Sequence, residues 1–465
     1  MHPAHKHDTI VALATPAGSG AIAVIRMSGP DSIRIAEDIF HPRKKGKKLS
    51  TAGNYSLHFG EIKTGAAVID EVLLSVFRNP HSYTGEDIIE ISCHGSTFIQ
   101  QQILRLCNHH GARYAEAGEF TLRAFLNRKM DLSQAEAVAD LIASDSAGAH
   151  HLAIEQMRGG FSSEIKRLRD ELIHFASLIE LELDFAEEDV EFASRDDLQR
   201  VIVRLQDYIS KLIESFDYGN VIRNGIPVVI AGKPNAGKST LLNALLNEER
   251  AIVSEIPGTT RDTIEEEIVI SGVKFRFIDT AGIRQTHDVI EKIGVNKAFE
   301  KMKQSPLVLY LFDLADTGPE DLKNELEEIR KEIHEDIKLV PVGNKVDKAG
   351  SAESHSEFHE FQNLLFISAR EKSGLDSIRS LLTSFIAESK KAQYSAVVTN
   401  VRHAEALRRT SDALTRAFNG LQNKVTNDFI SGDLRLALYH LGEITGEITT
   451  DDLLENIFSK FCIGK

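Results

Sequence analysis

A glycine-rich run at residues 232–239 carries residue types that bind phosphate. It reads Gly-Lys-Pro-Asn-Ala-Gly-Lys-Ser, follows an apolar run at 227–231 and precedes a helical run at 240–246. This spacing between a strand and a helix predicts a P-loop, in which backbone N–H groups close around phosphate oxygens at a helix N-terminus. We expect Lys238 to reach the β- and γ-phosphates of a nucleotide and the Ser239 hydroxyl to bind Mg²⁺.

A second polar run, Asn-Lys-Val-Asp at 344–347, could recognise a purine base, and it follows an apolar run at 338–342. The Asp347 carboxylate would accept hydrogen bonds from N1–H and the 2-amino group of guanine, whereas adenine has no donor at either position. Because buried polar pairing discriminates strongly between substrates, Asp347 predicts selection of GTP over ATP. The backbone amides of the run Ser-Ala-Arg at 368–370 are expected to support the base.

Two further polar loops are expected to respond to the γ-phosphate. In the run Asp-Thr-Ala-Gly at 279–282, Asp279 would hold Mg²⁺ through water, and the Gly282 amide would sense the γ-phosphate. In the loop at 258–262, Thr260 would complete the Mg²⁺ shell. Loops of this kind are ordered by the γ-phosphate and released on hydrolysis.

One position departs from the pattern of the signalling GTPases, which carry glutamine after the Asp-x-x-Gly run to orient the attacking water. Here that residue is Ile283, whose side chain can neither donate nor accept a hydrogen bond. Another group must therefore position the water, and the downstream candidates are Arg284, Gln285, Asp288 and Glu291. The spacing alone leaves these four open.

The elements that position these motifs alternate between strands and helices from residue 227 to about 386. Near-continuous apolar runs predict a buried parallel sheet covered by helices on both faces. The predicted strands lie at 227–231, 275–278, 307–312, 338–342 and 364–367.

Helical segments flank this α/β unit in the sequence. Apolar residues recur at spacings of three and four between 130 and 222, and Leu407, Leu414 and Leu421 recur every seven residues. The simplest architecture joins these segments into one helical domain that the α/β unit splits. The first 127 residues differ, because short strand-like runs dominate them; these lie at 9–14, 21–26, 72–77 and 87–91.

The composition excludes several classes of protein. The chain has 465 residues, 54 Lys+Arg and 69 Asp+Glu, and a formal net charge of −15. This charge argues against a protein that holds nucleic acid through a broad basic surface. Three cysteines without a Cys-x-x-Cys pair support neither a disulfide framework nor a zinc site. No apolar run approaches the ~20 residues of a membrane span, so we expect a cytoplasmic protein.

These motifs, taken in order, resemble the MnmE (TrmE/ThdF) family of tRNA-modification GTPases over essentially the whole chain. Other matching runs are Ala14–Pro16, Tyr83–Asp87, Gly118–Thr121, Ala124–Asn127, Asp131–Ala137 and the Cys-x-Gly-Lys run Cys462–Lys465. The resemblance implies a multidomain α/β plus α protein with an N-terminal α+β folate-binding domain and a helical domain split by an inserted Ras-like P-loop GTPase domain. The implied boundaries are 1–127 for the folate-binding and dimerisation domain, 128–222 and 388–465 for the helical domain, and 223–387 for the G domain.

The resemblance also implies a function. Members of the family form homodimers and work with the flavoprotein MnmG (GidA) in a heterotetramer. Together they add a carboxymethylaminomethyl-type group to C5 of the wobble uridine, position 34, of certain tRNAs. The one-carbon unit comes from a tetrahydrofolate derivative, either 5,10-methylene- or 5-formyl-tetrahydrofolate, and GTP hydrolysis with Mg²⁺ and K⁺ is required. The amine donor, ammonium or glycine, stays open.

The family's functional positions fall on specific residues here. The folate contacts match Arg26, Glu90, Lys129 and Lys465; the K⁺ ligands match Asn235, Ser254, Ile256 and Thr259; and the water-positioning glutamate matches Glu291. A K⁺ ion at that place would neutralise charge developing on the transferred phosphoryl group. The full set of expected nucleotide contacts is Asn235, Ala236, Gly237, Lys238, Ser239, Thr240, Ser254, Glu255, Ile256, Pro257, Gly258, Thr259, Thr260, Asp279, Thr280, Ala281, Gly282, Asn344, Lys345, Val346, Asp347, Ser368, Ala369 and Arg370.

Several of these residues have a plainer interpretation. Arg26 could be a structural ion-pair partner, Glu90 could face solvent on an alternating strand, and Lys129 could be an ordinary surface lysine. The Cys462 thiolate could add to C6 of uracil and activate C5, or the residue could be a small packed hydrophobe.

Two other functions also fit a GTPase. A ribosome-assembly or RNA-binding switch GTPase usually carries a KH-type or basic RNA-binding domain, and the sequence has no Gly-x-x-Gly clamp in a basic context and no basic tail. A stand-alone folate-dependent methyltransferase with a regulatory G domain is the third possibility.

Overall fold

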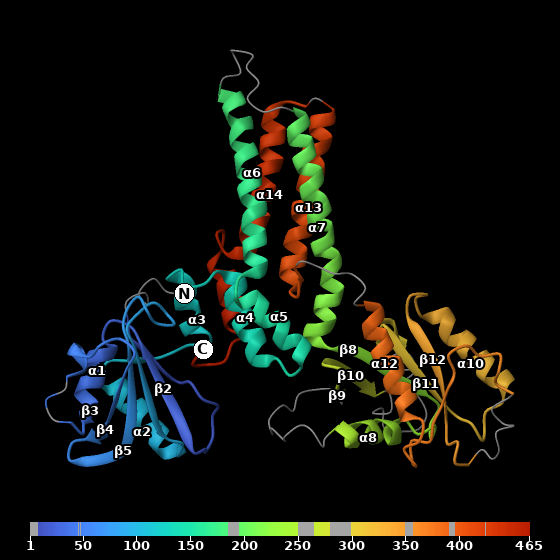
Figure 1. The fold of residues 1–465 in the computed structure, drawn as a ribbon, viewed down its shortest axis with the longest axis horizontal. Coiled ribbons are helices and arrows are strands. Elements are labelled where there is room, and N and C mark those ends of the chain that lie inside the picture. The colour runs from blue at the N-terminus through green and yellow to red at the C-terminus, as the bar shows by residue number, and fades with distance from the viewer. Residues whose placement is uncertain are drawn as a thin grey trace, which may run out of the picture. The chain divides into compact units, whose positions relative to one another are not determined.

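The computed structural model describes residues 8–44, 46, 48–184, 195–249, 265–279, 299–348, 357–389, 396–423 and 425–465. The chain forms two compact units. Unit 1 contains Met1–Ile142, Ile154–Ile209 and Glu405–Lys465, and unit 2 contains Ala143–Ala153 and Ser210–Ala404. Figure 1 shows the elements of both in chain colours.

A seven-stranded sheet in the order β3-β4-β5-β6-β2-β1-β7 forms the first part of unit 1. Its neighbours pair antiparallel except for β1 with β7, which are parallel. The strands are β1 (Ile10–Leu13), β2 (Ile22–Ser28), β3 (Phe40–Pro42), β4 (Ser56–Thr64), β5 (Ala67–Phe77), β6 (Ile88–His94) and β7 (Arg113–Tyr114). The four predicted strand-like runs are confirmed as β1, β2, part of β5 and β6.

The two faces of this sheet differ because side chains alternate along each strand. One face packs with α1 (Ser32–Ile39) and α2 (Thr97–His109) in a core that includes Ile25, Leu74 and Ile91. On β2 and β6, the alternate positions on the other face include Arg26 and Glu90, which are cross-strand partners. The alternation thus places two of the predicted folate residues on the face that the two helices leave uncovered.

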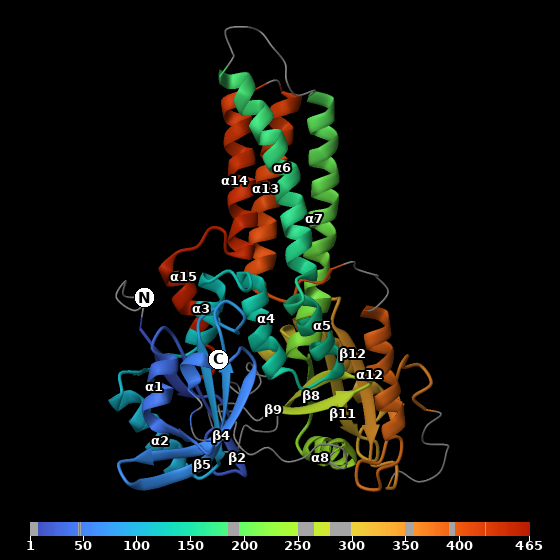
Figure 2. The ribbon, with the colours of Figure 1, turned by 60° about the vertical axis from the view of Figure 1, so that its left-hand side comes forward.

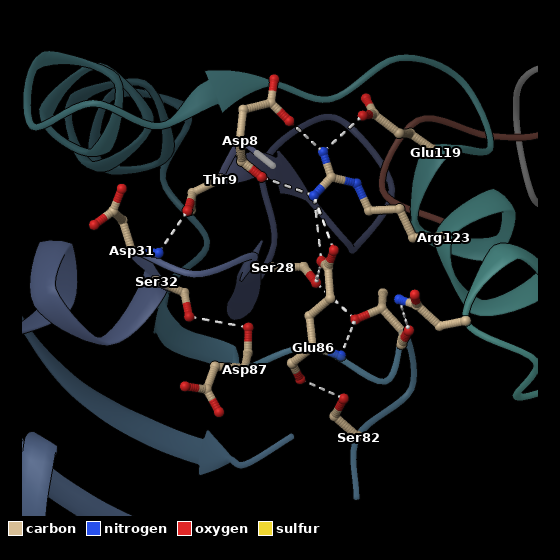
Figure 3. A network of polar contacts seen from close by, with 12 residues as sticks. Asp8, Thr9, Ser28, Asp31, Ser32, Ser82, Glu86, Asp87, Glu119 and Arg123 are labelled. Atoms are coloured by element: carbon tan, nitrogen blue, oxygen red, sulfur yellow. Dashed lines mark hydrogen bonds and ion pairs between the residues drawn. The ribbon is translucent and has the colours of Figure 1, made fainter. Parts of the chain in front are cut away.

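A buried ion network anchors the loop between β5 and β6 (Figure 3). Arg123 of α3 (Glu119–Leu126) contacts Asp8 at 2.6 Å, Glu119 at 3.0 Å and Glu86 at 3.2 Å. Glu86 also accepts a hydrogen bond from Ser28 of β2 at 2.7 Å. Arg123 and Glu119 are almost fully buried, so the loss of an ion-pair partner would leave a buried charge unpaired, which is strongly destabilising. The network therefore holds the loop against α3 and β2.

Within unit 1, helical segments that precede and follow residues 210–404 in the sequence pack together. Arg435 contacts Glu180 at 2.6 Å, and Gln206 donates a hydrogen bond to Thr415 at 2.9 Å. These contacts confirm the predicted split helical domain. The helices of these segments are α4 (Leu132–Ala143), α5 (Ala147–Met157), α6 (Gly160–Asp184), α7 (Arg195–Asn224), α13 (Val401–Gln422), α14 (Asn427–Thr445) and α15 (Asp451–Phe458). Of these, α4, α5, α7 and α13 extend into unit 2. None of the helices that the structure describes is long and apolar enough to cross a membrane.

Unit 2 contains a six-stranded sheet in the order β13-β12-β11-β8-β10-β9. The five predicted strands are confirmed as β8 (Ile226–Gly232), β10 (Val273–Asp279), β11 (Leu307–Asp313), β12 (Lys338–Asn344) and β13 (Leu365–Phe366). One core packs α8 (Lys238–Glu249) and α12 (Leu375–Ser389) against one face of the sheet, and a second packs α10 (Pro319–Glu332) against the other. Helices therefore cover both faces, as predicted.

The sheet of unit 2 is not wholly parallel, which corrects the prediction. β9 (Glu265–Ile270) pairs antiparallel with β10 at one edge. Ser271 and Gly272 join the two strands and both have positive φ, 52° and 79°. A two-residue turn with positive φ at both positions closes a hairpin, and a hairpin joins antiparallel strands.

The ion network predicts a specific dependence of stability on pH. Burial by itself raises the pKa of Glu119, but the hydrogen bonds and charges of Arg113 and Arg123 outweigh it and hold this pKa below its usual value. The same balance lowers the pKa of Asp8. A carboxyl whose pKa is lower in the folded state stabilises the fold above its unfolded pKa of about 4, and this stability is lost as pH falls through the folded pKa.

We therefore expect Arg123→Met to cost about 3–5 kcal/mol at pH 7, the usual loss when one partner of a buried ion pair is removed. The difference from wild type should shrink between pH 5 and pH 3. The free energy of unfolding at each pH is measured by urea unfolding, followed by pulsed hydrogen exchange of peptides from residues 8–129. The exposed Arg34→Met is the control, and an equal loss at pH 3 and pH 7 would contradict the network.

Candidate functional site: a P-loop and a cation–carboxylate pair

The P-loop connects β8 to α8 and depends on two glycines. Gly232 and Gly237 have φ of 142° and 100°, a region that side chains rarely adopt. A Cβ atom at Gly232 would lie 2.0 Å from the Leu311 carbonyl oxygen, and one at Gly237 would lie 2.2 Å from Nδ2 of Asn344. The loop can therefore lie close to β11 and β12 because both residues lack a side chain.

The Lys238 ammonium lies over this loop at the start of α8. Its Nζ donates to the carbonyl oxygens of Gly232 at 2.6 Å and Lys233 at 2.8 Å. Both bonds hold the ammonium against the loop at the N-terminal end of α8, where its charge and the helix N-terminus would attract the same anion. This is the arrangement that phosphate binding requires.

Asn344 joins the P-loop to the base-recognition loops. Its buried side chain donates from Nδ2 to the Ala236 carbonyl oxygen at 2.7 Å, and its Oδ1 accepts from the Ala369 backbone N–H at 3.0 Å. One amide thus satisfies a group in the P-loop and a group in the loop after β13. The structure brings together three of the runs that the sequence placed far apart.

The side chains expected at the base are also held in place. Ser368 Oγ donates to Oδ1 of Asp347 at 2.5 Å, and Lys345 Nζ contacts Oδ2 of Asp313 at 2.5 Å. Burial raises the pKa of Asp313, but the bond to Lys345 outweighs it and the net pKa is lowered. Asp313 was missed in the sequence, although it directly follows the strand-like run at 307–312.

Other predicted nucleotide residues have varied positions. Asn235 is exposed in the P-loop with φ of 63°, Ser239 and Thr240 are exposed in the first turn of α8, and Arg370 is exposed. Asp279 ends β10, beside Ile230 of β8. The remaining residues lie outside the described part of the chain: Ser254, Glu255, Ile256, Pro257, Gly258, Thr259, Thr260, Thr280, Ala281, Gly282, Ile283, Arg284, Gln285, Asp288 and Glu291.

The predicted folate residues Arg26 and Glu90 form an ion pair on the open face of the first sheet. Arg26 Nε and Nη2 lie 2.8 Å and 2.7 Å from Oε1 of Glu90, and the side chains are 16% and 24% exposed. The guanidinium carbon lies 5.6 Å from the ring centroid of Tyr83 and 5.8 Å from that of Phe120. The pair is therefore reachable from solvent and is flanked by aromatic rings.

Tyr83 was not predicted as a site residue, although it belongs to a run that carries the family resemblance. Its hydroxyl bonds to Thr121 at 2.8 Å, and burial raises the pKa of the phenol. The ion network around Glu86 and Arg123 holds the loop that carries Tyr83. The ring is therefore fixed beside Arg26 by contacts that the sequence pattern could not reveal.

The other two folate candidates have different surroundings. Lys129 is exposed and donates from Nζ to the Pro80 carbonyl oxygen at 2.9 Å, on the loop that carries Tyr83. Lys465 follows Gly464, whose carbonyl oxygen accepts from Arg26 Nη1 at 3.4 Å. Cys462 is exposed, so the packed-hydrophobe interpretation is wrong, whereas Cys93 and Cys107 are buried.

The sheet of unit 2, its P-loop and the side chains of Asn344 and Asp347 define a Ras-like P-loop GTPase domain. Family models match nearly the whole chain: the GTP-binding protein TrmE N-terminus matches residues 9–129, and the MnmE helical domain matches residues 132–462. The chain belongs to the MnmE family.

Curated relatives agree over their full length. The tRNA modification GTPase MnmE of Flavobacterium psychrophilum is 55% identical over 462 residues, covering 99% of each chain. The proteins of the same name from Cytophaga hutchinsonii and Bacteroides thetaiotaomicron are 52% and 51% identical over 98% of this chain. Among solved structures, a point variant of Aquifex aeolicus Era bound to GDP and AlF4⁻ is 27% identical, with a TM-score of 0.27 over 40% of this chain and 66% of that one.

The contacts of Asp347 predict how base selection can be changed. Asp347→Asn replaces one acceptor oxygen with a donor and leaves Ser368 in place, so guanine loses a hydrogen-bond acceptor. Because an unpaired buried group discriminates by 10⁴-fold or more in favourable cases, we expect the preference for GTP over ATP to fall at least 100-fold. Competition binding with fluorescent nucleotides measures it. Ser368→Ala should have a smaller effect, and unchanged preference in Asp347→Asn would contradict the assignment.

Proposed function

We propose that this chain is a K⁺-stimulated GTPase that modifies tRNA. Together with a flavoprotein partner of the MnmG (GidA) type, it adds a carboxymethylaminomethyl-type group to C5 of the wobble uridine at position 34. The observation that carries the proposal is that one chain contains both the GTP site around Asn344 and a partly exposed Arg26–Glu90 pair. The full-length relatives named tRNA modification GTPase support the substrate class.

GTP and Mg²⁺ fit the residues of unit 2. The Lys238 ammonium and the start of α8 supply positive potential for phosphate oxygens, and the exposed Ser239 hydroxyl offers an oxygen of the kind that Mg²⁺ prefers. We assign Thr260 as the second hydroxyl ligand, Asp279 to the outer shell of the ion and Glu291 to the attacking water, on the family resemblance. Bound Mg²⁺ neutralises charge on the phosphate oxygens.

A K⁺ ion fits the P-loop through Asn235. Its left-handed backbone and exposed side chain place an amide oxygen at the surface of the loop, and a carbonyl-type oxygen is the donor that a hard cation takes. The family resemblance adds Ser254, Ile256 and Thr259 as further ligands. Bound K⁺ supplies positive charge beside the transferred phosphoryl group.

A tetrahydrofolate derivative fits the Arg26–Glu90 pair. The pyrimidine edge of a pterin offers paired N–H donors, and a carboxylate accepts such donors through both oxygens. Glu90 would hold that edge beside Tyr83, while Arg26, Lys129 and Lys465 would hold carbonyl and carboxylate oxygens of the ligand. The Arg26–Glu90 ion pair, the bond of Arg26 to the Gly464 carbonyl and the bond of Lys129 to the Pro80 carbonyl support this assignment.

A homodimer is supported by an apolar patch on β4 and β5. Phe59 and Leu73 are cross-strand partners on the face away from α1 and α2, and Leu57 lies two residues from Phe59 on the same face. Their exposed fractions are 47%, 43% and 61%. Because contiguous exposed apolar residues mark interaction surfaces, we assign this patch to a second copy of the chain.

The acidic charge of the chain bears on tRNA binding. A net charge of −15 is unfavourable for contact with many phosphates, so we assign most phosphate contacts to the flavoprotein in the heterotetramer. This chain then supplies GTP switching, the folate site and local contacts to tRNA. The proposed domains keep the boundaries 1–127, 128–222, 223–387 and 388–465, and we place the protein in the cytoplasm.

The proposed function is tested by nucleoside analysis of tRNA. We expect deletion of the gene to remove the C5 modification at position 34 of the affected tRNAs, as measured by mass spectrometry of digested tRNA, and re-expression to restore it. A chain with Lys238→Ala should fail to restore it because the phosphate contact is lost. Normal wobble uridines after deletion would contradict the proposal and favour a ribosome-assembly GTPase.

The cation assignment predicts different rates in different salts. GTP turnover should be at least tenfold faster in 100 mM KCl than in 100 mM NaCl, because the family resemblance assigns this site to K⁺. Steady-state phosphate release measures the two rates. Asn235→Ala should reduce the K⁺ effect, whereas Asn243→Ala, outside the P-loop, should keep it. Equal rates in the two salts would exclude the cation mechanism.

A further inference from the structure

The segment 458–465 packs against the first part of unit 1, although about 330 residues separate the two in sequence. Phe458, the last residue of α15, shares an apolar cluster with Leu122 of α3 and Leu132 of α4. Its ring lies 5.2 Å from the ring of Phe461. Figures 1 and 2 both place the C label beside the N-terminal sheet. The apolar cluster thus anchors the beginning of the segment.

Backbone hydrogen bonds fix the next residues. Ala117 and Ile463 form an antiparallel bridge, and the Gly118 N–H lies 3.4 Å from the Cys462 carbonyl oxygen. The Lys465 N–H donates to the same carbonyl at 3.3 Å. The Cys462 carbonyl therefore has two donors, one from each side of the contact.

Two glycines make this approach possible. Gly118 has φ of +66°, and a Cβ atom there would lie 2.6 Å from the Phe458 carbonyl oxygen. Gly464 has φ of +94°, and its Cβ atom would lie 2.2 Å from the Leu13 carbonyl oxygen. In both cases the nearest atom belongs to the backbone, so no side-chain rotation relieves the contact. Any other residue at Gly464 would push the segment away from β1 and would also strain its own φ.

The same glycine is bonded to the predicted ligand site. Arg26 Nη1 donates to the Gly464 carbonyl oxygen at 3.4 Å, while its other nitrogens contact Glu90. Gly464 lies between Cys462 and Lys465 in sequence. Its position relative to β1 and Arg26 therefore constrains the backbone from which the Cys462 and Lys465 side chains extend.

We propose that Gly464 and Gly118 are positioning residues that hold Cys462 and Lys465 at the Arg26–Glu90 site. This inference rests on the proposed folate site and adds two backbone positions to it. The segment 458–465 would then line that site. Its position depends on the close approach of Gly118 to the Phe458 carbonyl and of Gly464 to the Leu13 carbonyl, and a methyl group on either glycine would prevent that approach.

The test compares Gly464→Ala with wild type in the full-length protein, with 5-formyl-tetrahydrofolate as the probe. We expect the dissociation constant, measured by titration calorimetry, to rise at least tenfold, while the melting temperature and GTP turnover remain unchanged. Exchange of the Gly118 amide, followed in peptides from residues 115–121, should become at least tenfold faster because its acceptor on Cys462 moves. A residue that only supported the fold would lower the melting temperature without this local pattern.

The matched control is Gly65→Ala. Gly65 also has positive φ, +60°, but a Cβ atom there meets nothing within 4 Å, so the variant tests backbone strain without the close contact. It should bind the probe as wild type does. Gly118→Ala should repeat the loss of affinity.

A second measurement needs no variant. In wild type, saturating 5-formyl-tetrahydrofolate should slow exchange of the Gly118 amide at least threefold, because a ligand held by Lys465 fixes the segment. The positioning role would be overturned if Gly464→Ala bound the probe as tightly as wild type. It would also be overturned if the probe left exchange of the Gly118 amide unchanged. Absence of probe binding to wild type would instead overturn the folate assignment, and faster Gly118 exchange in Gly464→Ala would then still support the backbone contact.

Discussion

The parallel pairing of β8 with β10 and β11, and of β11 with β12, is the constraint on which the nucleotide site depends. Parallel strands end at the same edge of a sheet, so the loops that follow them meet there. The P-loop begins at the end of β8, Asp279 and Asp313 are the last residues of β10 and β11, and the base-recognition run begins with the last residue of β12. The Asn344 amide then links the P-loop to the loop after β13. A shift of either loop would leave one of its polar atoms buried without a partner, which is costly.

The first part of unit 1 differs, because its sheet is antiparallel except for β1 with β7, and α1 and α2 pack against only one of its faces. Polar residues on that face, Arg26 and Glu90, remain reachable, while the buried charges of Arg123 and Glu119 hold the neighbouring loop and α3. Burial of these charges costs free energy, and their mutual contacts offset the cost. As a result, Tyr83 lies beside Arg26. Gly118, directly before α3, donates its N–H to the Cys462 carbonyl of the segment 458–465.

The two candidate sites lie in different units, and they use different chemistry. One arranges positive charge for phosphate around Lys238, and the other arranges a carboxylate and cations for a planar polar ligand. Both use glycine at close approaches: a Cβ atom would meet backbone at Gly232, Gly118 and Gly464, and the Asn344 side chain at Gly237. A close backbone approach is a recurrent solution here because it gives fixed positions without mobile side chains.

The sequence alone determined the elements and motifs whose signal is local. Strands at β8, β11 and β12 followed from continuous apolar runs, the P-loop from its spacing, and the split helical domain from apolar periodicity on both sides of the α/β unit. The antiparallel β9 was missed because a short strand with acidic residues gives no strong pattern, and the hairpin turn depends on φ at Ser271. The folate residues came from family resemblance, since nothing in their spacing predicts that they are neighbours.

Only the tertiary structure decided which distant residues meet. The pairing of Arg26 with Glu90, the contact of Asp313 with Lys345, the ion network of Arg123 and the docking of the segment 458–465 all join residues far apart in sequence. It also decided that Cys462 is exposed rather than packed. Local propensity acts over a few residues, whereas these contacts are set by strand register and by the packing of whole elements, which no local pattern encodes.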